Sequence, residues 1–578
     1  MMHRALANLR VAVVSLAPAL IVALPPFFWV REAMYRASLT TLGRDQGIFQ
    51  YIAWAVMNGE VDYRDVRDVN GPLIHEVHMA LLAFGGRDEH VFRTLDLAVT
   101  GIVFAIVGAC LPGIERNFRA TGRVAEVGSR LGWALAGWVV LCGQLMNYLY
   151  WDLAQRETFC HWFILPSVAL QLLATQKIAQ EASPKRWTWV IALAGMLSVI
   201  TWFGKPTFAL FTMVQLVTLA IDRHLPIRPW KLIALFLAGG AIGALTQIAF
   251  VLRYGDLGMW LRISFSDVPA MYRFMMPRTP REILSLQWGG PPSALAFVSA
   301  CAIIALIIDG QMARRALVIA LYPLCGVVSV ITQGKGFPYH FHPVTAGLYM
   351  QWLLLVVWLW ERFSLRSRGT VMRFVPIGAA AILAGRVSWL VPQSSHIASI
   401  WILDKGETAD KRASHDYLVY FRDHDFFPWE MRQAAAYLKE HTKPTDKVQL
   451  YAMDPYVLFL AERKSATPYI YAYDLNADAA LAGSWWKGGL HPTEPQAQRI
   501  REIRDAHEAD MLAKLQKDPP AAFVFIDGSP LLSYGDAWVD FRVHNPDAAE
   551  WVESRYRETA AFGEDRIWLR RDLTGNKL

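Results

Sequence analysis

Cysteine is scarce in this chain of 578 residues, which has five cysteines and none beyond residue 325. They are Cys110, Cys142, Cys160, Cys301 and Cys325, all in or beside apolar stretches. So few cysteines, with no metal-type spacing, exclude a disulfide-stapled secreted domain. Glycine-rich nucleotide-binding fingerprints are absent as well, so we expect no ATP or other nucleotide site. Charged residues make up only 19% of the chain, against about a quarter in an average soluble protein.

The chain is instead rich in apolar residues, and its charge is unevenly distributed. Hydrophobic residues make up 54% of the sequence, which excludes a disordered chain. Residues 1–392 hold 34 Lys+Arg and 21 Asp+Glu, whereas residues 393–578 hold 23 and 29. The sequence therefore predicts a membrane domain over 1–392 and a soluble domain over 393–578. The net charge of +7 divides into +13 and −6, which basic cytoplasmic loops explain without a nucleic-acid partner.

Eleven apolar stretches approach the ~20 residues that a helix needs to cross a bilayer. They lie at about 11–30, 95–113, 131–150, 159–175, 187–203, 206–221, 231–252, 291–308, 316–332, 343–360 and 374–392. A twelfth stretch, Pro72–Gly86, is short and contains two histidines and a glutamate, so it could lie in the membrane interface instead. The expected fold class is an all-α membrane protein of about eleven transmembrane helices. Interfacial helices in the first external loop and a C-terminal soluble α/β domain complete it.

Basic residues in the short loops predict the orientation. If Pro72–Gly86 does not cross and the N-terminus is cytoplasmic, the cytoplasmic loops and the N-terminus hold 18 Lys+Arg against 6 acids. Because basic loops stay on the cytoplasmic side, this arrangement is favoured. We therefore expect a multi-pass protein of the cytoplasmic (inner) membrane, with a cytoplasmic N-terminus and an extracytoplasmic C-terminal domain.

The C-terminal domain has the pattern of an α/β fold. Its predicted helices are Pro428–His441, Pro455–Lys464 and Glu494–Gln516, and its predicted strands are Val448–Met453, Tyr469–Tyr473 and Ala521–Asp527.

The segment Gly43–Pro72 directly follows the first apolar stretch. It contains Asp-x-Gly at Asp45, an apolar-aromatic helix, Gly59 and the triplet Tyr63-Arg64-Asp65. This pattern resembles the first external loop of the GT-C membrane glycosyltransferases, which include protein O-mannosyltransferases and aminoarabinose transferases. The resemblance implies that Asp45 is the general base of an inverting sugar transfer, and that Tyr63, Asp65 and Asn70 contact substrate. The alternative is that Asp45 only caps the helix that begins near Gly47.

The loop departs from the family at one point. Family members commonly carry a lysine before Pro-Pro, where it meets the donor phosphate, but this chain has Asn70-Gly71-Pro72. Another cation must then neutralise the phosphate, and Arg64 and Arg67 are nearby in the sequence. Their alternation with Asp65 and Asp68 fits a salt-bridged surface equally well.

Two shorter motifs fall on the predicted external side. In Trp151–Glu157, the resemblance gives Asp152 and Glu157 the task of positioning the acceptor or a metal, and Arg156 suits a phosphate. Arg156 and Glu157 could also simply pair with each other.

Lys205, in the sequence Gly-Lys-Pro, could also bind phosphate, although a lysine that only reaches for the membrane boundary would look the same. In Gln333–Pro343, Lys335 lies between glycines and could meet an anion. Tyr339 and His340 would add a substrate-binding wall, unless this turn only anchors aromatics at the interface. We predict no metal site from these histidines, although a divalent cation is compatible with the family resemblance.

The sequence and the resemblance together predict a hexosyl- or pentosyltransferase. The expected donor is a polyprenyl-phosphate sugar, the acceptor is a glycan, lipid or protein, and membrane lipid surrounds the chain. One alternative is a transporter of polyprenyl lipids or solutes, but the inverted repeats and midplane charges typical of transporters are not evident. Another is a membrane-anchored sensor, for which eleven spans are more than an anchor requires.

Overall fold

The computed structural model describes residues 2–117, 122–181, 184–222, 225–366, 377–378, 409–423, 425–484 and 489–574. The chain divides into two compact units. The first, which we call the bundle unit, comprises Met1–Leu39, His90–Gln247 and Pro280–Leu403. The second, which we call the loop-tail unit, comprises Thr40–Glu89, Ile248–Thr279 and Asp404–Leu578. The domain boundary predicted after residue 392 lies outside the described residues.

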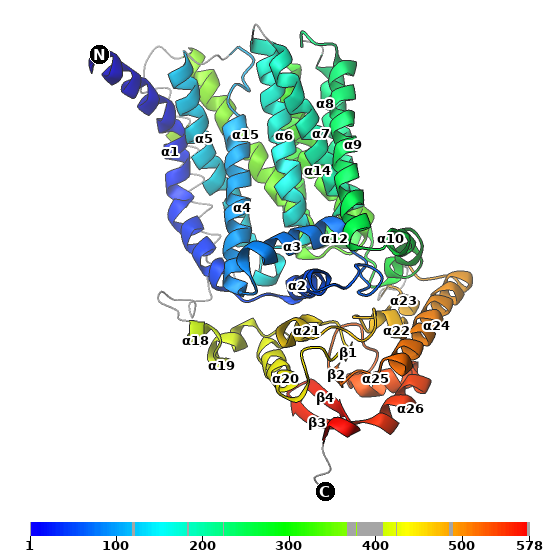
Figure 1. Ribbon diagram of the computed structural model, residues 1–578. Helices are drawn as coiled ribbons and strands as arrows, with labels where there is room; N and C mark the ends of the chain where they lie inside the picture. The colour runs from blue at the N-terminus through cyan, green and yellow to red at the C-terminus, as the bar shows by residue number, and fades with distance from the viewer. Residues whose placement is uncertain are drawn as a thin grey trace. The chain divides into compact units, whose positions relative to one another are not determined.

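Long helices make up the bundle unit (Figure 1). They are α1 (Met2–Leu39), α4 (Glu89–Cys110), α5 (Arg123–Cys142), α6 (Arg156–Gln180), α7 (Thr188–Ile200), α8 (Ala209–Ile221), α9 (Pro229–Tyr254), α13 (Gly290–Ile308), α14 (Leu317–Gln333) and α15 (His342–Arg366), with the short α12 (Pro280–Ser285). In the described part of the chain, nine helical segments are long and apolar enough to cross a membrane, and Pro206–Ile221 is a shorter apolar helix. These ten coincide with ten of the predicted stretches. The eleventh, 374–392, lies outside the described residues except for 377–378.

Glycines let neighbouring helices of the bundle unit approach closely. A Cβ atom on Gly108 of α4 would lie 2.1 Å from the Trp133 carbonyl oxygen of α5. Between α7 and α9, a Cβ atom on Gly239 would lie 1.8 Å from the Ala192 carbonyl oxygen. Small residues at such crossings are typical of membrane helices, where dispersion contacts drive association.

The loop-tail unit is built from three separate segments of the chain. From the first loop come α2 (Arg44–Met57) and α3 (Pro72–Gly85), and from the middle segment come α10 (Leu257–Arg262) and α11 (Val268–Ala270). The 14 residues of α3 span about 21 Å, short of the ~30 Å hydrocarbon core of a bilayer.

The tail contributes helices and the only sheet among the described residues. Its helices are α18 (Ala409–Arg412), α19 (His415–Leu418), α20 (Pro428–His441), α21 (Tyr456–Ala461), α22 (Tyr473–Asn476), α23 (Asp478–Ala482), α24 (Glu494–Lys517), α25 (Ala537–His544) and α26 (Pro546–Arg555). Its strands are β1 (Val448–Tyr451), β2 (Ala522–Ile526), β3 (Tyr556–Phe562) and β4 (Asp565–Arg570), in the order β1-β2-β4-β3. β1 and β2 run parallel with Val448 opposite Ala522, and β4 pairs antiparallel with both β2 and β3.

Most predicted tail elements agree with the structure, and one is wrong. The helices predicted at Pro428–His441, Pro455–Lys464 and Glu494–Gln516 and the strands at Val448–Met453 and Ala521–Asp527 are all present. Tyr469–Tyr473, predicted as a strand, is not one, because the chain turns there and α22 begins at Tyr473. Its aromatic run is instead buried by packing, and the Tyr471 and Tyr473 rings stack 5.0 Å apart.

Candidate functional site

A buried polar cluster lies at one end of the bundle unit, where several helices begin or end. Arg156 and Glu157 open α6, Lys205 follows the α7 segment, Lys335 follows α14, and Tyr339 and His340 lie in the 3₁₀ turn Pro338–Phe341 before α15. The structure therefore brings together six of the residues that the sequence singled out, from four separate parts of the chain.

An ion pair forms the centre of this cluster. Lys205 Nζ donates to Glu157 Oε1, and His340 Nε2 lies 3.9 Å from the same oxygen. All three side chains are buried, and Glu157 Oε2 has no hydrogen-bond partner. Burial lowers the pKa of Lys205 to about 8, although Glu157 opposes this shift. The predicted pairing of Arg156 with Glu157 is replaced by pairing with a lysine 48 residues further along the chain.

Lys335 adds a second buried lysine to the cluster. The glycines on either side of it, Gly334 and Gly336, have φ values of +66° and +67°, a region that favours glycine. Burial lowers the pKa of Lys335 to about 7. The Arg156 guanidinium carbon lies 5.9 Å from the centroid of the Tyr339 ring. The positive charges of Lys205, Arg156 and Lys335 all interact electrostatically with His340.

Asp152 lies in a short turn just before α6. It is buried, and its Oδ2 accepts a hydrogen bond of 3.3 Å from the Leu149 amide. Two residues on, Ala154 has a φ of +50°, so the turn is strained at a residue other than glycine. Asp152 and Glu157 both act electrostatically on Tyr148.

Asp45 lies in the first turn of α2 in the loop-tail unit and is half-buried. It does not supply the helix cap, because α2 begins at Arg44 and its N-cap residue is Gly43, so Asp45 already lies inside the helix. Its neighbour Arg44 is held by Asp425 at 3.0 Å and by Asp454 at 2.8 Å. No hydrogen bond or ion pair joins the Asp45 carboxylate to another described residue.

The other predicted residues of this loop mainly hold it in shape. Tyr63 is buried with a φ of +66°, and its hydroxyl donates to the Asn70 carbonyl at 2.9 Å. The Asn70 side chain donates to both oxygens of Asp68 at 2.9 Å. Arg64 is largely exposed and pairs with Asp65 at 2.8 Å, which matches the salt-bridged alternative.

Sequence reasoning missed the buried centre of this loop, His75. Its Nδ1 lies 2.7 Å from Asp62 Oδ2 and its Nε2 lies 2.9 Å from Asp68 Oδ2. Tyr471, from the tail, donates to Asp68 at 2.9 Å. Burial opposes protonation, but the two carboxylates outweigh it and raise the pKa of His75 to about 10. Histidine within a short polar run was the available signal. Its carboxylate partners lie 13 and 7 residues earlier in the chain, but Tyr471, which donates to Asp68, lies 403 residues from it.

Among the described residues, no group of three or more His, Cys, Asp or Glu side chains could hold a metal ion. His75 already uses both ring nitrogens on carboxylates.

The fold is that of a helical, multi-pass membrane protein with a mixed α/β C-terminal region. The chain is similar to the crystal structure of ArnT from Cupriavidus metallidurans bound to undecaprenyl phosphate. The TM-score is 0.52 at 12% identity, over 96% of this chain and 99% of that one. No family model matches the chain, and no curated protein matches it by sequence.

Two further solved structures have lower scores. Apo ArnT from the same organism gives a TM-score of 0.49 at 12% identity, over 94% of this chain and 97% of that one. The oligosaccharyltransferase AglB from Archaeoglobus fulgidus, in complex with an inhibitory peptide and a dolichol-phosphate, gives 0.43 at 11% identity, over 96% and 73%. The fold is therefore assigned from the first structure alone.

Proposed function

We propose that this chain is a membrane glycosyltransferase, which moves a hexose or pentose from a polyprenyl-phosphate donor to an acceptor at the extracytoplasmic face of the inner membrane. The observation that carries the proposal is the cluster of the half-buried Arg156 with the buried Lys205 and Lys335, in a fold similar to that of ArnT. Basic side chains gathered in this way suit a phosphate group. ArnT, which shares the fold, was crystallised with undecaprenyl phosphate.

In the proposed reaction the basic cluster holds the donor phosphate. Arg156 offers a planar guanidinium that matches two phosphate oxygens, while Lys205 and Lys335 add point charges. Glu157 keeps Lys205 in place through their ion pair. Arg64 on the first loop is a further candidate phosphate ligand. Tyr339 and His340 form a wall against which a sugar ring can pack.

Asp45 is the proposed general base. It accepts the proton of the acceptor hydroxyl as that oxygen attacks the anomeric carbon, and the bond from that carbon to the phosphate oxygen breaks. The products are an inverted glycoside and polyprenyl phosphate. Its lack of a fixed partner supports this role, because a carboxylate committed to an ion pair is a weaker base. Asp152 is proposed to position the acceptor, and Tyr63, Asp65 and Asn70 to shape the loop that meets substrate.

The proposal keeps the predicted organisation of the chain. Residues 1–392 would form the catalytic membrane domain, and residues 393–578 would form an extracytoplasmic α/β domain, with a cytoplasmic N-terminus. The acceptor is a glycan, a lipid or a protein, and a divalent cation is not required by the roles given above.

The test compares cells that lack the gene with cells complemented by wild type, Asp45→Asn or the exposed-loop control Asp88→Asn. Mass spectrometry of envelope glycolipids, glycoproteins and polyprenyl-phosphate sugars is the measurement. We expect the deletion and Asp45→Asn to lose one glycosylated product and to accumulate one polyprenyl-phosphate sugar. Transfer by Asp45→Asn should fall by about 10²–10⁴-fold, while Asp88→Asn behaves as wild type. An unchanged glycan profile in the deletion would refute the function, and full rescue by Asp45→Asn would refute the base.

A further inference from the structure

A large open groove lies within the loop-tail unit, between the C-terminal ends of α2 and α9. Its volume is about 1140 Å³. Backbone pairing fixes its floor, since the Asp62 amide donates to the Tyr254 carbonyl at 2.9 Å and the Asp256 amide to the Asp62 carbonyl at 3.0 Å. A Cβ atom at Gly255 would lie 3.3 Å from Asp62, so the backbone segments around Asp62 and Gly255 approach closely there.

The groove lies at the height where a membrane helix ends. The last turn of α9 forms one wall through Phe250, Leu252, Arg253 and Tyr254, and α9 is a candidate span of 26 residues. Apolar side chains in the groove are unusually exposed, with Leu252 at 64% and Met57 at 46%. Apolar side chains beside the end of a span suit the acyl chains of a lipid.

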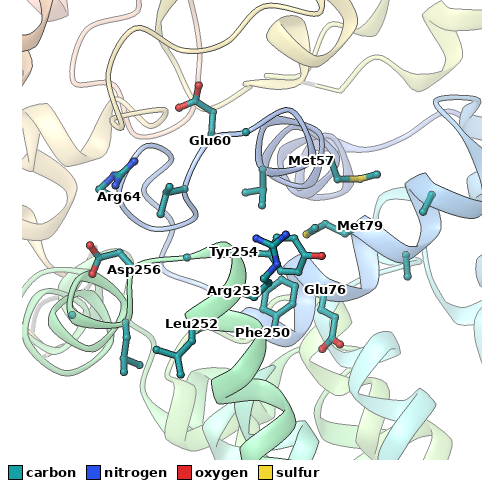
Figure 2. A pocket seen from close by; sticks show the side chains of 18 residues that line it. Met57, Glu60, Arg64, Glu76, Met79, Phe250, Leu252, Arg253, Tyr254 and Asp256 are labelled. Atoms are coloured by element: carbon teal, nitrogen blue, oxygen red, sulfur yellow. The ribbon is translucent and has the colours of Figure 1, made fainter.

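Charged side chains line the groove at both ends (Figure 2). Met57, Met79 and Glu76 lie on one side of Arg253, and Glu60, Arg64 and Asp256 lie on the other. Glu60 is paired with Lys464 at 3.1 Å. Arg253 makes no ion pair with a described residue, and its guanidinium carbon lies 5.1 Å from the Tyr254 ring centroid. At the charged end, Arg64 is paired with Asp65. Asp256 uses Oδ1 to cap α10, by accepting from the Met259 amide at 2.9 Å.

We propose that this groove binds a zwitterionic glycerophospholipid with an amine head group, of the phosphatidylethanolamine type. The order of the two methionines, Arg253 and Asp256 matches the order of acyl chain, phosphate and ammonium in such a lipid. Arg253 meets the phosphate, and the free oxygen of Asp256 accepts from the ammonium. An anionic lipid without an amine would leave the acidic end of the groove unmatched.

The proposed lipid binding does not depend on the proposed sugar transfer, although Arg64 lines the groove and is also a candidate ligand of the donor phosphate. Asp45 and Met57 are twelve residues apart on α2, which at 1.5 Å per residue is about 18 Å. A lipid head group bound near Arg253 would therefore be too far from Asp45 to react there.

The test uses the purified full-length chain in detergent and phosphatidylethanolamine with a photoreactive group in one acyl chain. Labelled peptides are mapped by mass spectrometry, with competition by unlabelled phosphatidylethanolamine, phosphatidylglycerol or undecaprenyl phosphate. We expect label at 56–57, 79–83 or 250–254, displaced by phosphatidylethanolamine only. Arg253→Gln and Asp256→Asn should each lower apparent affinity by about tenfold, as expected for one charge-assisted hydrogen bond. Asparagine keeps the cap on α10.

The matched control is Arg262→Gln, which removes an exposed arginine of α10 outside the groove and should leave labelling unchanged. Equal melting temperatures and elution profiles confirm that every variant folds. Label that no lipid displaces, or that phosphatidylglycerol displaces equally, would overturn the proposal by indicating non-specific annular lipid. Displacement by undecaprenyl phosphate would overturn it by indicating a polyprenyl site. Loss of sugar transfer with intact labelling would bear only on the proposed function.

Discussion

At the scale of single residues, Asp565 illustrates what an unpartnered buried charge does to stability. It opens β4, is fully buried, and neither carboxylate oxygen has a hydrogen-bond partner. Burial first, and then the charges of Asp454 and Glu430, raise its pKa well above the usual value. The protonated form is therefore favoured in the folded state. Above the ordinary aspartate pKa the unfolded chain releases this proton and the folded chain keeps it, so stability falls as the pH rises.

Asp565→Asn should remove this penalty. Near pH 4 the variant and the wild type should melt alike, and at pH 8 the variant should be the more stable by about 1–3 kcal/mol, the cost of a buried unsatisfied group. Thermal unfolding in detergent between pH 4 and pH 8 measures the difference. Equal pH dependence in the two proteins would show that Asp565 finds a partner in solution.

The buried lysines of the bundle unit predict a second pH dependence, in the proposed binding of a donor phosphate. Burial lowers the pKa of Lys335 to about 7 and that of Lys205 to about 8. Above these values each lysine must take up a proton to meet a phosphate. The affinity for undecaprenyl phosphate should therefore fall above pH 8 by up to about tenfold per pH unit for each such lysine.

Isothermal titration between pH 7.5 and 9.5 checks this expectation, in a range where the phosphate itself no longer titrates. Lys335→Gln should bind more weakly and show a shallower slope, whereas the exposed-lysine control Lys231→Gln should match wild type. If the affinity of the wild type did not change with pH, the expected role of the two lysines would be contradicted.

The candidate site was predictable from sequence only where a residue reveals its own chemistry. Lys205 and Lys335 stand beside glycines at the ends of apolar stretches, so their position alone made them candidates. The partner of Glu157 was not predictable, because Lys205 lies 48 residues away and the adjacent Arg156 was the nearer choice. His75 was missed because nothing local indicates that Asp62 and Asp68 enclose it.

At the scale of elements, the membrane makes helices easy to predict and leaves the strands of the tail difficult. A bilayer sets the length and the apolar content of a span, so ten predicted stretches coincide with helices. β3 was missed because it has no clean alternation, with two exposed residues directly after Tyr556. β4 alternates between buried and half-buried residues and was also missed. Tyr469–Tyr473 was predicted as a strand because it is rich in aromatic residues. In the structure, tertiary packing buries these side chains outside any strand.

Helix spacing gives a prediction at this scale. Gly239→Leu should push α9 away from α7, because even a Cβ atom would lie 1.8 Å from the Ala192 carbonyl oxygen. Overpacking of this kind costs about 1–3 kcal/mol, read as a lower apparent melting temperature in detergent. The control is Ala241→Leu, two positions on in an exposed part of the same helix. Equal melting of the two variants would mean that the helices separate at little cost.

At the scale of the whole molecule, distant parts of the sequence share one compact unit. The first loop, the segment after α9 and the tail pack together in the loop-tail unit. Buried polar contacts join them, since Arg44 binds two tail aspartates and Asp68 accepts from Tyr471. A charge-based boundary in the sequence separates the tail from the loop that carries Asp45. Composition averages over neighbours in the chain and therefore does not report pairing between distant segments.

A substitution of Arg67 would test most directly whether the three segments fold together, because this residue joins all three of them. Its guanidinium lies 3.0 Å from Asp267 of the middle segment and 3.2 Å from Asp474 of the tail, and all three side chains are buried. Arg67→Met should leave two buried carboxylates without their cation, at a cost of about 3–5 kcal/mol. Arg64→Met, three positions earlier and largely exposed, should cost at most about 1 kcal/mol.

Limited proteolysis of the full chain, with the cut sites mapped, distinguishes shared from separate folding. If the three segments fold as one unit, Arg67→Met should speed cleavage in the first loop, in residues 255–279 and in the tail together, and Arg64→Met should change none of them. Faster cleavage confined to the first loop would instead mean that the tail keeps its fold without the loop. The buried arginine would then only anchor the loop onto a tail that is already stable.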